Sequence, residues 1–300
     1  MFFGASIVAG ISRILILGEA KVEQMIIKAL VENTSVSEEY KNEHGLCLYI
    51  ETLNHKLLFD LGASSLFAEN AKKLGVDISE VDLVVISHGH YDHGGGLKTF
   101  LNVNAKAKIY VNRQAFAKHY ASRQGGEKVY IGLDEALMQS ERLIFAGEHF
   151  IIDQELELFS NIKGRKLISS GNQDLLMESG GMLVQDDFSH EQNLIISEGG
   201  KTLLVAGCAH NGIVNIIDHM IEIKHSPPHY VIGGFHLYSR SADKHEDPAL
   251  INLIGLYLKD TGSFCYTCHC TGIEPYQSLK EIMREKIKYL STGSQLKILS

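Results

Sequence analysis

A short segment, His88–His93, places three histidines and one aspartate within six residues. It belongs to the run S-H-G-H-Y-D-H-G-G-G, which follows the largely apolar run V-D-L-V-V-I. Imidazole nitrogens and carboxylate oxygens are ligands that divalent cations such as Zn²⁺ take, and the glycines let the backbone turn sharply so that side chains converge. We interpret the segment as a metal-binding loop behind a buried strand, rather than as a histidine-rich turn without a metal.

Three later segments also place a histidine in a glycine- or cysteine-containing loop after an expected strand. They read G-C-A-H-N-G around His210, G-G-F-H-L around His236 and C-H-C-T-G around His269. The chain has 15 histidines against 28 lysines and arginines, and this excess of imidazole suggests a metal. Histidines without a motif, such as His44 and His119, are expected at the surface, although His119 and Arg123 are also weak candidates for substrate contact.

Hydrophobic periodicity predicts short strands interspersed with helices from residue 25 onward. The β-like runs cover 25–31, 45–52, 56–60, 81–87, 109–111, 143–145, 150–159, 182–185, 193–197, 202–206, 230–232, 264–267 and 296–299. Helical spacing covers 66–74, 213–223, 250–258 and 275–286. Runs of strands with helices in both halves and no linker predict two packed sheets with outer helices.

The pattern also predicts the domain organisation. We expect one domain over 25–300, with a polar, partly helical insertion around 113–140. Residues 1–24 differ in character, because they are mostly apolar as far as Leu17 and a second methionine, Met25, opens the first strand. We interpret them as an N-terminal extension of upstream or vector-derived sequence, the alternative being a genuine element that packs on the fold. The apolar part is too short for a transmembrane helix, which needs roughly 20 residues.

Composition narrows the possible partners. With 45% hydrophobic and 21% charged residues the chain is typical of a globular protein, and its net charge of −8 argues against a nucleic-acid partner. Five cysteines, an odd number, argue against a secreted disulfide framework. We predict a cytoplasmic protein that acts on a small-molecule substrate, without a nucleic-acid or membrane partner. The oligomeric state is left open.

The segment over 88–93 resembles the H-x-H-x-D-H motif of the metallo-β-lactamase superfamily. The resemblance covers roughly residues 25–290 and implies an α/β fold, the four-layer αββα sandwich. The three later motifs resemble the branch called metal-dependent hydrolases of the β-lactamase superfamily II. Some members of that branch carry the label 7,8-dihydropterin-6-methyl-4-(β-D-ribofuranosyl)aminobenzene 5′-phosphate synthase, which implies pterin and ribose-phosphate chemistry.

The resemblance implies two metal sites, each with ligands from more than one loop. In the family the first two histidines of the motif bind one metal, which places His88 and His90 in site one. We expect His210 to be the third ligand there. His190, in S-H-E-Q-N before an expected strand, is the alternative.

The remaining residues of the motif are expected to bind the second metal. The resemblance places Asp92 and His93 there, completed by His269 as the C-terminal ligand. Many members carry a bridging aspartate in a G-D pair, where this chain has Gly207 and Cys208. We leave open whether Cys208 bridges or approaches the metals as a thiolate or is a small buried residue.

Two further features keep more than one interpretation. His236 is a metal ligand, a substrate-polarising group or a histidine of the pocket wall. Cys265 and Cys268 form a C-x-x-C pair that precedes Cys270, and an independent zinc or redox site there is the alternative to a simple neighbourhood of His269.

The expected function is metal-dependent hydrolysis. Two divalent ions, zinc with manganese or iron as alternatives, would hold a water whose lowered pKa yields hydroxide near neutrality. Asp92 and His236 are the expected catalytic residues, the first by orienting the nucleophile and the second by stabilising negative charge. A phosphoester, in a phosphodiesterase-like reaction, is the favoured substrate. A carboxylic ester or lactone, or a non-catalytic metal-binding role, is the alternative.

Overall fold

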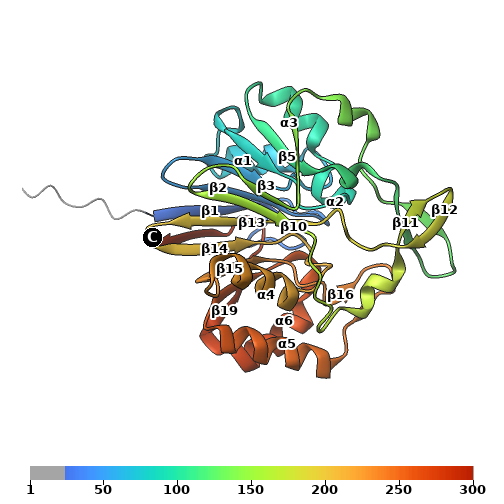
Figure 1. The fold of residues 1–300 in the computed structure, drawn as a ribbon. Coiled ribbons are helices and arrows are strands. Elements are labelled where there is room, and N and C mark those ends of the chain that lie inside the picture. The colour runs from blue at the N-terminus through green and yellow to red at the C-terminus, as the bar shows by residue number, and fades with distance from the viewer. Residues whose placement is uncertain (1–23, 300) are drawn as a thin grey trace, which may run out of the picture.

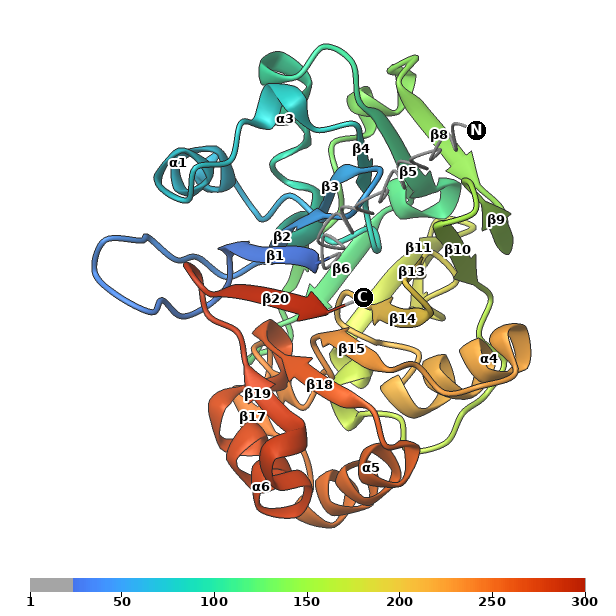
Figure 2. The same ribbon diagram turned by 90° about the vertical axis from the view of Figure 1, so that its left-hand side faces the viewer.

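Two seven-stranded sheets stacked face to face form the centre of the molecule (Figure 1). The computed structural model describes residues 24–299, so the expected extension over 1–24 lies, except for Gln24, outside the described residues. Helices cover the outer face of each sheet, as the view along the strands in Figure 2 shows. This four-layer arrangement confirms the predicted αββα sandwich.

The first sheet contains strands from the N-terminal half and the last strand of the chain. Its strands, in spatial order, are β20 (Gln295–Leu299), β1 (Gln24–Val31), β2 (Cys47–Glu51), β3 (Lys56–Phe59), β4 (Leu83–Val85), β5 (Lys108–Asn112) and β8 (Leu143–Ala146). Strands β20 to β3 pair antiparallel, whereas β3, β4, β5 and β8 run parallel. The predicted buried strand before the histidine motif is therefore β4, at the centre of the parallel part.

The second sheet belongs to the C-terminal half. Its strands, in spatial order, are β19 (Ile287–Tyr289), β18 (Phe264–Thr267), β15 (Tyr230–Gly233), β14 (Lys201–Val205), β13 (Gln192–Glu198), β10 (Leu156–Ser160) and β9 (His149–Ile151). Strands β14, β15, β18 and β19 run parallel, and the others pair antiparallel. Each histidine motif of this half follows one of these parallel strands.

Helices bury their apolar sides against the outer faces of the sheets. They are α1 (Leu66–Lys73) and α3 (Leu97–Val103) on the first sheet, and α4 (Ile213–Lys224), α5 (Pro248–Thr261) and α6 (Ile273–Met283) on the second. Asp247 caps α5 by accepting a hydrogen bond from the Ala249 amide, and Pro248 occupies the first turn, where no amide proton is needed. No helix of the described 24–299 region is both long and apolar enough to cross a bilayer.

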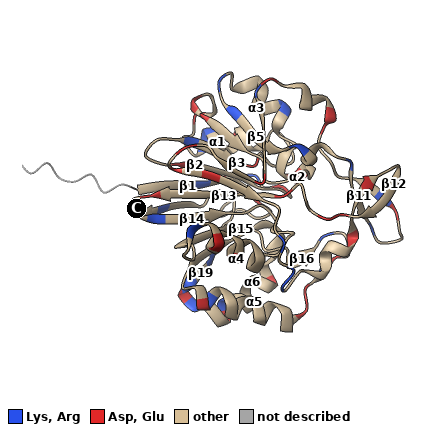
Figure 3. Ribbon diagram, in the orientation of Figure 1, with Lys and Arg blue, Asp and Glu red and all other residues tan. Residues whose placement is uncertain are grey.

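Charged residues lie mainly on the outer helices, loops and strand ends (Figure 3). The space between the sheets is filled by apolar residues from both, such as Leu48 and Phe59 from the first and Leu194 and Leu203 from the second. Burial of this shared layer fixes the two sheets against each other, so loops from different halves of the chain keep constant relative positions.

A small third sheet projects beyond the sandwich at the right of Figure 1, and we call it the arm. Its strands, in spatial order, are β12 (Met182–Gln185), β11 (Leu175–Ser179), β6 (His119–Ser122) and β7 (Lys128–Tyr130). The segment 113–140, expected to be a partly helical insertion, supplies β6, β7 and two short 3₁₀ turns, and it connects the directly paired strands β5 and β8. A hairpin of β16 (Tyr238–Ser239) and β17 (Lys244–His245) lies beside it in the site described below.

Phe59 is fully buried between the sheets, so its removal tests the shared core. We expect Phe59→Ala to lower the free energy of unfolding by about 3–5 kcal/mol, because a ring-sized cavity adds to the lost transfer free energy. Leu53, which is 62% exposed, is the control, and Leu53→Ala should change the free energy of unfolding by less than about 1 kcal/mol. Urea unfolding followed by circular dichroism measures both, and equal losses would contradict this account of the core.

Candidate metal centre

Four loops converge at one end of the sandwich, each at the carboxyl end of a parallel strand. They follow β4, β14, β15 and β18, and parallel neighbours deliver their following loops to the same edge of a sheet. The sequence-predicted residues that these loops bring together are His88, His90, Asp92, His93, Cys208, His210, His236 and His269.

One group of donors is formed by His88, His90 and His210. The ring centroids of His88 and His210 are 4.9 Å apart, and those of His90 and His210 are 5.0 Å apart. Nε2 of His88 lies 3.1 Å from Nδ1 of His90. One donor atom each of His88, His210 and Cys208 lies within 4.8 Å of the others.

A second group is formed by Asp92, His93 and His269. Nε2 of His93 lies 3.2 Å from Nε2 of His269, and Oδ2 of Asp92 lies 3.3 Å from the same His269 atom. The Sγ atom of Cys208 is 3.2 Å from Nε2 of His93. Cys208 therefore lies between the two groups, in contact with His93 of the second and within 4.8 Å of a donor atom of His88 and of His210 in the first.

Asp60 and Ser87 fix which ring nitrogens of His88 and His93 carry a proton. The Asp60 carboxylate can only accept, so Ser87 Oγ donates to it at 2.7 Å and Nδ1 of His93 donates to it at 2.6 Å. Because the Ser87 hydroxyl proton is used in this way, Ser87 Oγ accepts from Nδ1 of His88 at 2.8 Å. Both histidines consequently turn Nε2 toward the site.

Two asparagines fix the other histidines in the same manner. Nδ1 of His269 donates to Oδ1 of Asn33 at 2.8 Å, and Nδ1 of His210 donates to Oδ1 of Asn172 at 3.1 Å. Each asparagine also donates its Nδ2 to the backbone carbonyl of the same histidine, which defines the orientation of the amide. Nε2 is again left for the site.

These arrangements leave buried nitrogens that the protein itself does not satisfy. His93 and His269 both use Nδ1 as a donor, so they turn their Nε2 atoms toward each other at 3.2 Å. Nε2 of His90 and Nε2 of His210 are buried and have no hydrogen-bond partner among the described residues. Such groups are costly unless something compensates them. Divalent cations would satisfy them, so these nitrogen, carboxylate and sulfur donors fit a metal centre.

The electrostatics of the two groups differ. Burial, together with neighbouring imidazoles, holds the pKa of His88 and of His210 well below the ordinary value, so their lone pairs are available near neutral pH. Burial also lowers the pKa of His93, but the charges of Asp60 and Asp92 outweigh it and raise that pKa to about 9. The carboxylates thus favour positive charge at the second group.

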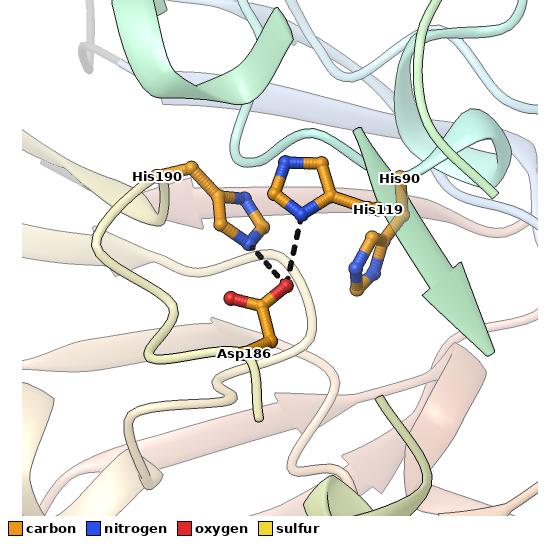
Figure 4. Close-up of side chains that lie close together, drawn as sticks. All are labelled: His90, His119, Asp186 and His190. Carbon is orange, nitrogen blue, oxygen red and sulfur yellow. Dashed lines mark hydrogen bonds and ion pairs between the residues drawn. The ribbon is translucent and has the colours of Figure 1, made fainter. Parts of the chain in front are cut away.

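His190, the alternative to His210, lies in a cluster with His119, Asp186 and His90, of which His90 also belongs to the first group (Figure 4). Nδ1 of His190 accepts the Gly89 amide proton at 2.9 Å, and Nε2 lies 3.3 Å from the Asp186 carboxylate. Both ring nitrogens of His190 are therefore occupied, whereas Nε2 of His210 is free. The geometry favours His210 over His190 as a donor.

The same cluster corrects the expectation of a surface position for His119. The side chain of His119 is fully buried, and its Nδ1 lies 2.9 Å from the Asp186 carboxylate. Burial opposes ionisation of Asp186, but the hydrogen bonds from His119 and His190 outweigh it and hold the pKa of Asp186 far below its usual range. Asp186 thereby orients His190, which in turn holds the backbone of the motif loop at Gly89.

Sequence reasoning also missed His44, for which no motif gave a signal. Nε2 of His44 lies 3.2 Å from Oδ2 of Asp92, and its ring centroid is 4.8 Å from that of His269. Burial lowers the pKa of His44, although its hydrogen bond to Asp92 opposes this. His44 lines the pocket that opens onto the site.

The three cysteines in and directly after β18 are divided between the core and the site. Cys265 packs with the outer helices and Cys268 packs between the sheets, so the C-x-x-C pair does not converge on a metal site of its own. Cys270 instead lies with Cys208 and His236, one donor atom of each being within 4.8 Å of the others. Both ring nitrogens of His236 are buried without a hydrogen-bond partner in the described region.

The sequence matches a known family. The family model described as the metallo-beta-lactamase superfamily matches residues 41–232, more than half of the chain. The chain belongs to the metallo-beta-lactamase superfamily. Typical members of this superfamily are metal-dependent hydrolases, which agrees with the His, Cys and Asp cluster described above.

Two relatives are each less than 30% identical to this chain. A Methanocaldococcus jannaschii protein named only as uncharacterized protein MJ0448 is 29% identical over 267 residues, which cover 86% of this chain and 94% of that one. From the same organism, a 7,8-dihydropterin-6-methyl-4-(beta-D-ribofuranosyl)-aminobenzene-5′-phosphate synthase is 26% identical and covers 94% of this chain and 100% of its own length.

Solved structures share the same fold. Tm1679, described as a metal-dependent hydrolase of the beta-lactamase superfamily, superposes with a TM-score of 0.76 at 29% identity, covering 92% of this chain and 100% of its own. A diphosphatase from the PhnP family has a TM-score of 0.54 at 11% identity, covering 92% and 97%. The latter likeness shows the fold alone.

Among the described residues, the Asp60 carboxylate forms hydrogen bonds only with Ser87 and His93, so its replacement tests the orientation of the histidines. We expect Asp60→Asn to weaken zinc binding by about 10–100-fold, because an amide cannot accept from both partners with the same strength. Asp77→Asn, at an exposed 3₁₀ cap, is the matched control and should bind zinc like the wild type. Competition titration with a chromogenic chelator measures the affinity, and unchanged binding by Asp60→Asn would refute the orienting role.

Proposed function

We propose that this protein is a hydrolase that uses two divalent cations, zinc or alternatively manganese or iron, to cleave a phosphoester. The observation that carries the proposal is the pair of buried Nε2 atoms on His90 and His210 that have no hydrogen-bond partner among the described residues, with the Nε2 atoms of His93 and His269 and the thiol of Cys208 nearby. Donors in two adjoining groups that share one thiol are suited to two cations rather than one.

The proposed ligands follow the two groups. The first cation would be held by His88, His90 and His210, the second by Asp92, His93 and His269, with Cys208 between them. When bound, such cations supply Lewis acidity, which lowers the pKa of water and polarises a phosphoryl or carbonyl oxygen.

Two side chains of the chain are suited to act on the reacting groups. Asp92 exposes a carboxylate to the pocket and can orient a water molecule by accepting its proton in a hydrogen bond. His236 lines the same pocket, and neither of its ring nitrogens has a partner within the described 24–299 region, so it can donate a hydrogen bond to an oxygen that gains negative charge.

Relatives support a phosphoester as the substrate. The pocket above the centre is lined by donors of both groups and by residues of the arm and of the β16–β17 hairpin. One relative is named a 5′-phosphate synthase, and a protein of the same fold is a diphosphatase. A carboxylic ester or a lactone is the alternative substrate class. The cytoplasmic location stays a prediction from the sequence.

Removing one ligand of each group tests the metal centre. We expect His88→Ala and Asp92→Ala each to lose most of the bound metal and to reduce phosphoester hydrolysis by at least about 1000-fold, because the cations supply the reactive water. His149→Ala, in an exposed residue of β9 outside these clusters, should retain both. Metal analysis and rates with chromogenic phosphodiester, phosphomonoester and lactone substrates measure the effect. Full metal content and activity in both variants would contradict the assignment, and cleavage of the lactone alone would favour the other substrate class.

Replacement of His236 should affect catalysis without affecting the amount of bound metal. We expect His236→Ala to lower kcat by about 100-fold with little change in bound metal, because it removes a hydrogen-bond donor to developing charge. His225→Ala is the matched control, since both residues have a left-handed backbone (φ 50° for His236 and 57° for His225) and His225 is exposed. Loss of metal from His236→Ala would instead identify His236 as a ligand.

A further inference from the structure

Two arginines line the mouth of the pocket above the proposed metal centre. Arg123 follows strand β6 of the arm, and Arg240 follows β16 in the neighbouring hairpin. The two segments touch, because Nε2 of Gln124 donates to the Ala242 carbonyl at 3.1 Å. The arginines therefore belong to one rim although they are more than a hundred residues apart in the chain.

Neither guanidinium is neutralised by the protein. Among the described residues, no carboxylate lies within salt-bridge distance of Arg123 or Arg240, although the chain as a whole has an acidic excess. Nη1 of Arg123 donates to the Ser241 hydroxyl at 3.0 Å, and Nη1 of Arg240 donates to the Tyr91 hydroxyl at 3.2 Å. These bonds to neutral groups orient the side chains and leave most of their five N–H donors free.

The charge of Arg240 reaches the metal centre. It acts on His44, whose pKa it helps to lower, and His44 in turn contacts Asp92. Between the histidines and the rim, the pocket wall includes the apolar side chains Ala121, Ile131 and Leu175. A molecule that fills the pocket thus meets the proposed metal-ligating side chains at the centre, an apolar wall, and two positively charged guanidinium groups at the mouth.

We propose that Arg123 and Arg240 bind an anionic group of the substrate, a phosphate or a carboxylate, that is separate from the ester cleaved at the metal centre. The planar fork of a guanidinium matches both oxyanions, and a second unpaired arginine doubles the attraction for a dianion. The assignment of this group to a substrate rests on the proposed function. Binding of the anion itself depends on the two arginines.

The test uses three ligands that share a benzyl group and cannot be hydrolysed: benzylphosphonate, phenylacetate and benzyl alcohol. We expect calorimetry on the metal-loaded protein to show that at least one of the two anions binds more tightly than the alcohol and that its affinity falls with added salt. Arg123→Met and Arg240→Met should each weaken binding of that anion by about tenfold, the size expected for loss of a charge-assisted contact. Arg284→Met, at an exposed arginine of the 3₁₀ turn Arg284–Lys286, is the control and should bind like the wild type.

Each outcome decides the proposal. Tighter binding of benzylphosphonate than of phenylacetate identifies a phosphate group, and the reverse order identifies a carboxylate. Equal anion binding by the wild type and both pocket variants, or binding of the alcohol as tight as that of the anions, would overturn the proposal. If the arginine-dependent binding is found but none of the chromogenic esters is cleaved, the hydrolase assignment fails while the anion site stands.

Discussion

The hydrogen bonds of one buried carboxylate, Asp60, underlie the geometry of the whole site. Asp60 lies directly after β3 and accepts from the Ser87 amide, the Ser87 hydroxyl and Nδ1 of His93. It therefore joins the ends of two parallel strands and determines the tautomers of His88 and His93 at the same time. Without a charged acceptor at this point, the lone pairs that face the centre would be free to turn away.

Other buried carboxylates hold the loops of the second half of the chain in the same way. Glu32, after β1 of the first sheet, accepts from the His269 amide at 2.6 Å and from the Tyr289 hydroxyl at 2.7 Å. Glu191 accepts from the amides of His210 and Asn211 at 2.6 Å and 2.9 Å. The donors of the centre are thus attached to both sheets, whose relative position is set by the apolar layer between them.

The two ends of the pocket are built from different kinds of structure. Side chains that contact the proposed cations come from loops anchored directly to the parallel strands, where burial and hydrogen bonds leave little freedom. The rim comes from the arm and the β16–β17 hairpin, which lie outside the sandwich core. Segments of this outer kind vary more than the elements that carry them, so the rim can change without disturbing the centre.

Local patterns in the sequence were sufficient for the sandwich fold and for the loops around His88, His210, His236 and His269, because strand periodicity and a histidine motif are short-range features. Burial of His119 and the partners that occupy both ring nitrogens of His190 were decided only by tertiary structure. His190 bonds to Gly89 across 101 residues, and its partner Asp186 is shared with His119 across 67. Which nitrogen of a histidine is free depends on such distant partners, and the sequence pattern around that histidine does not contain them.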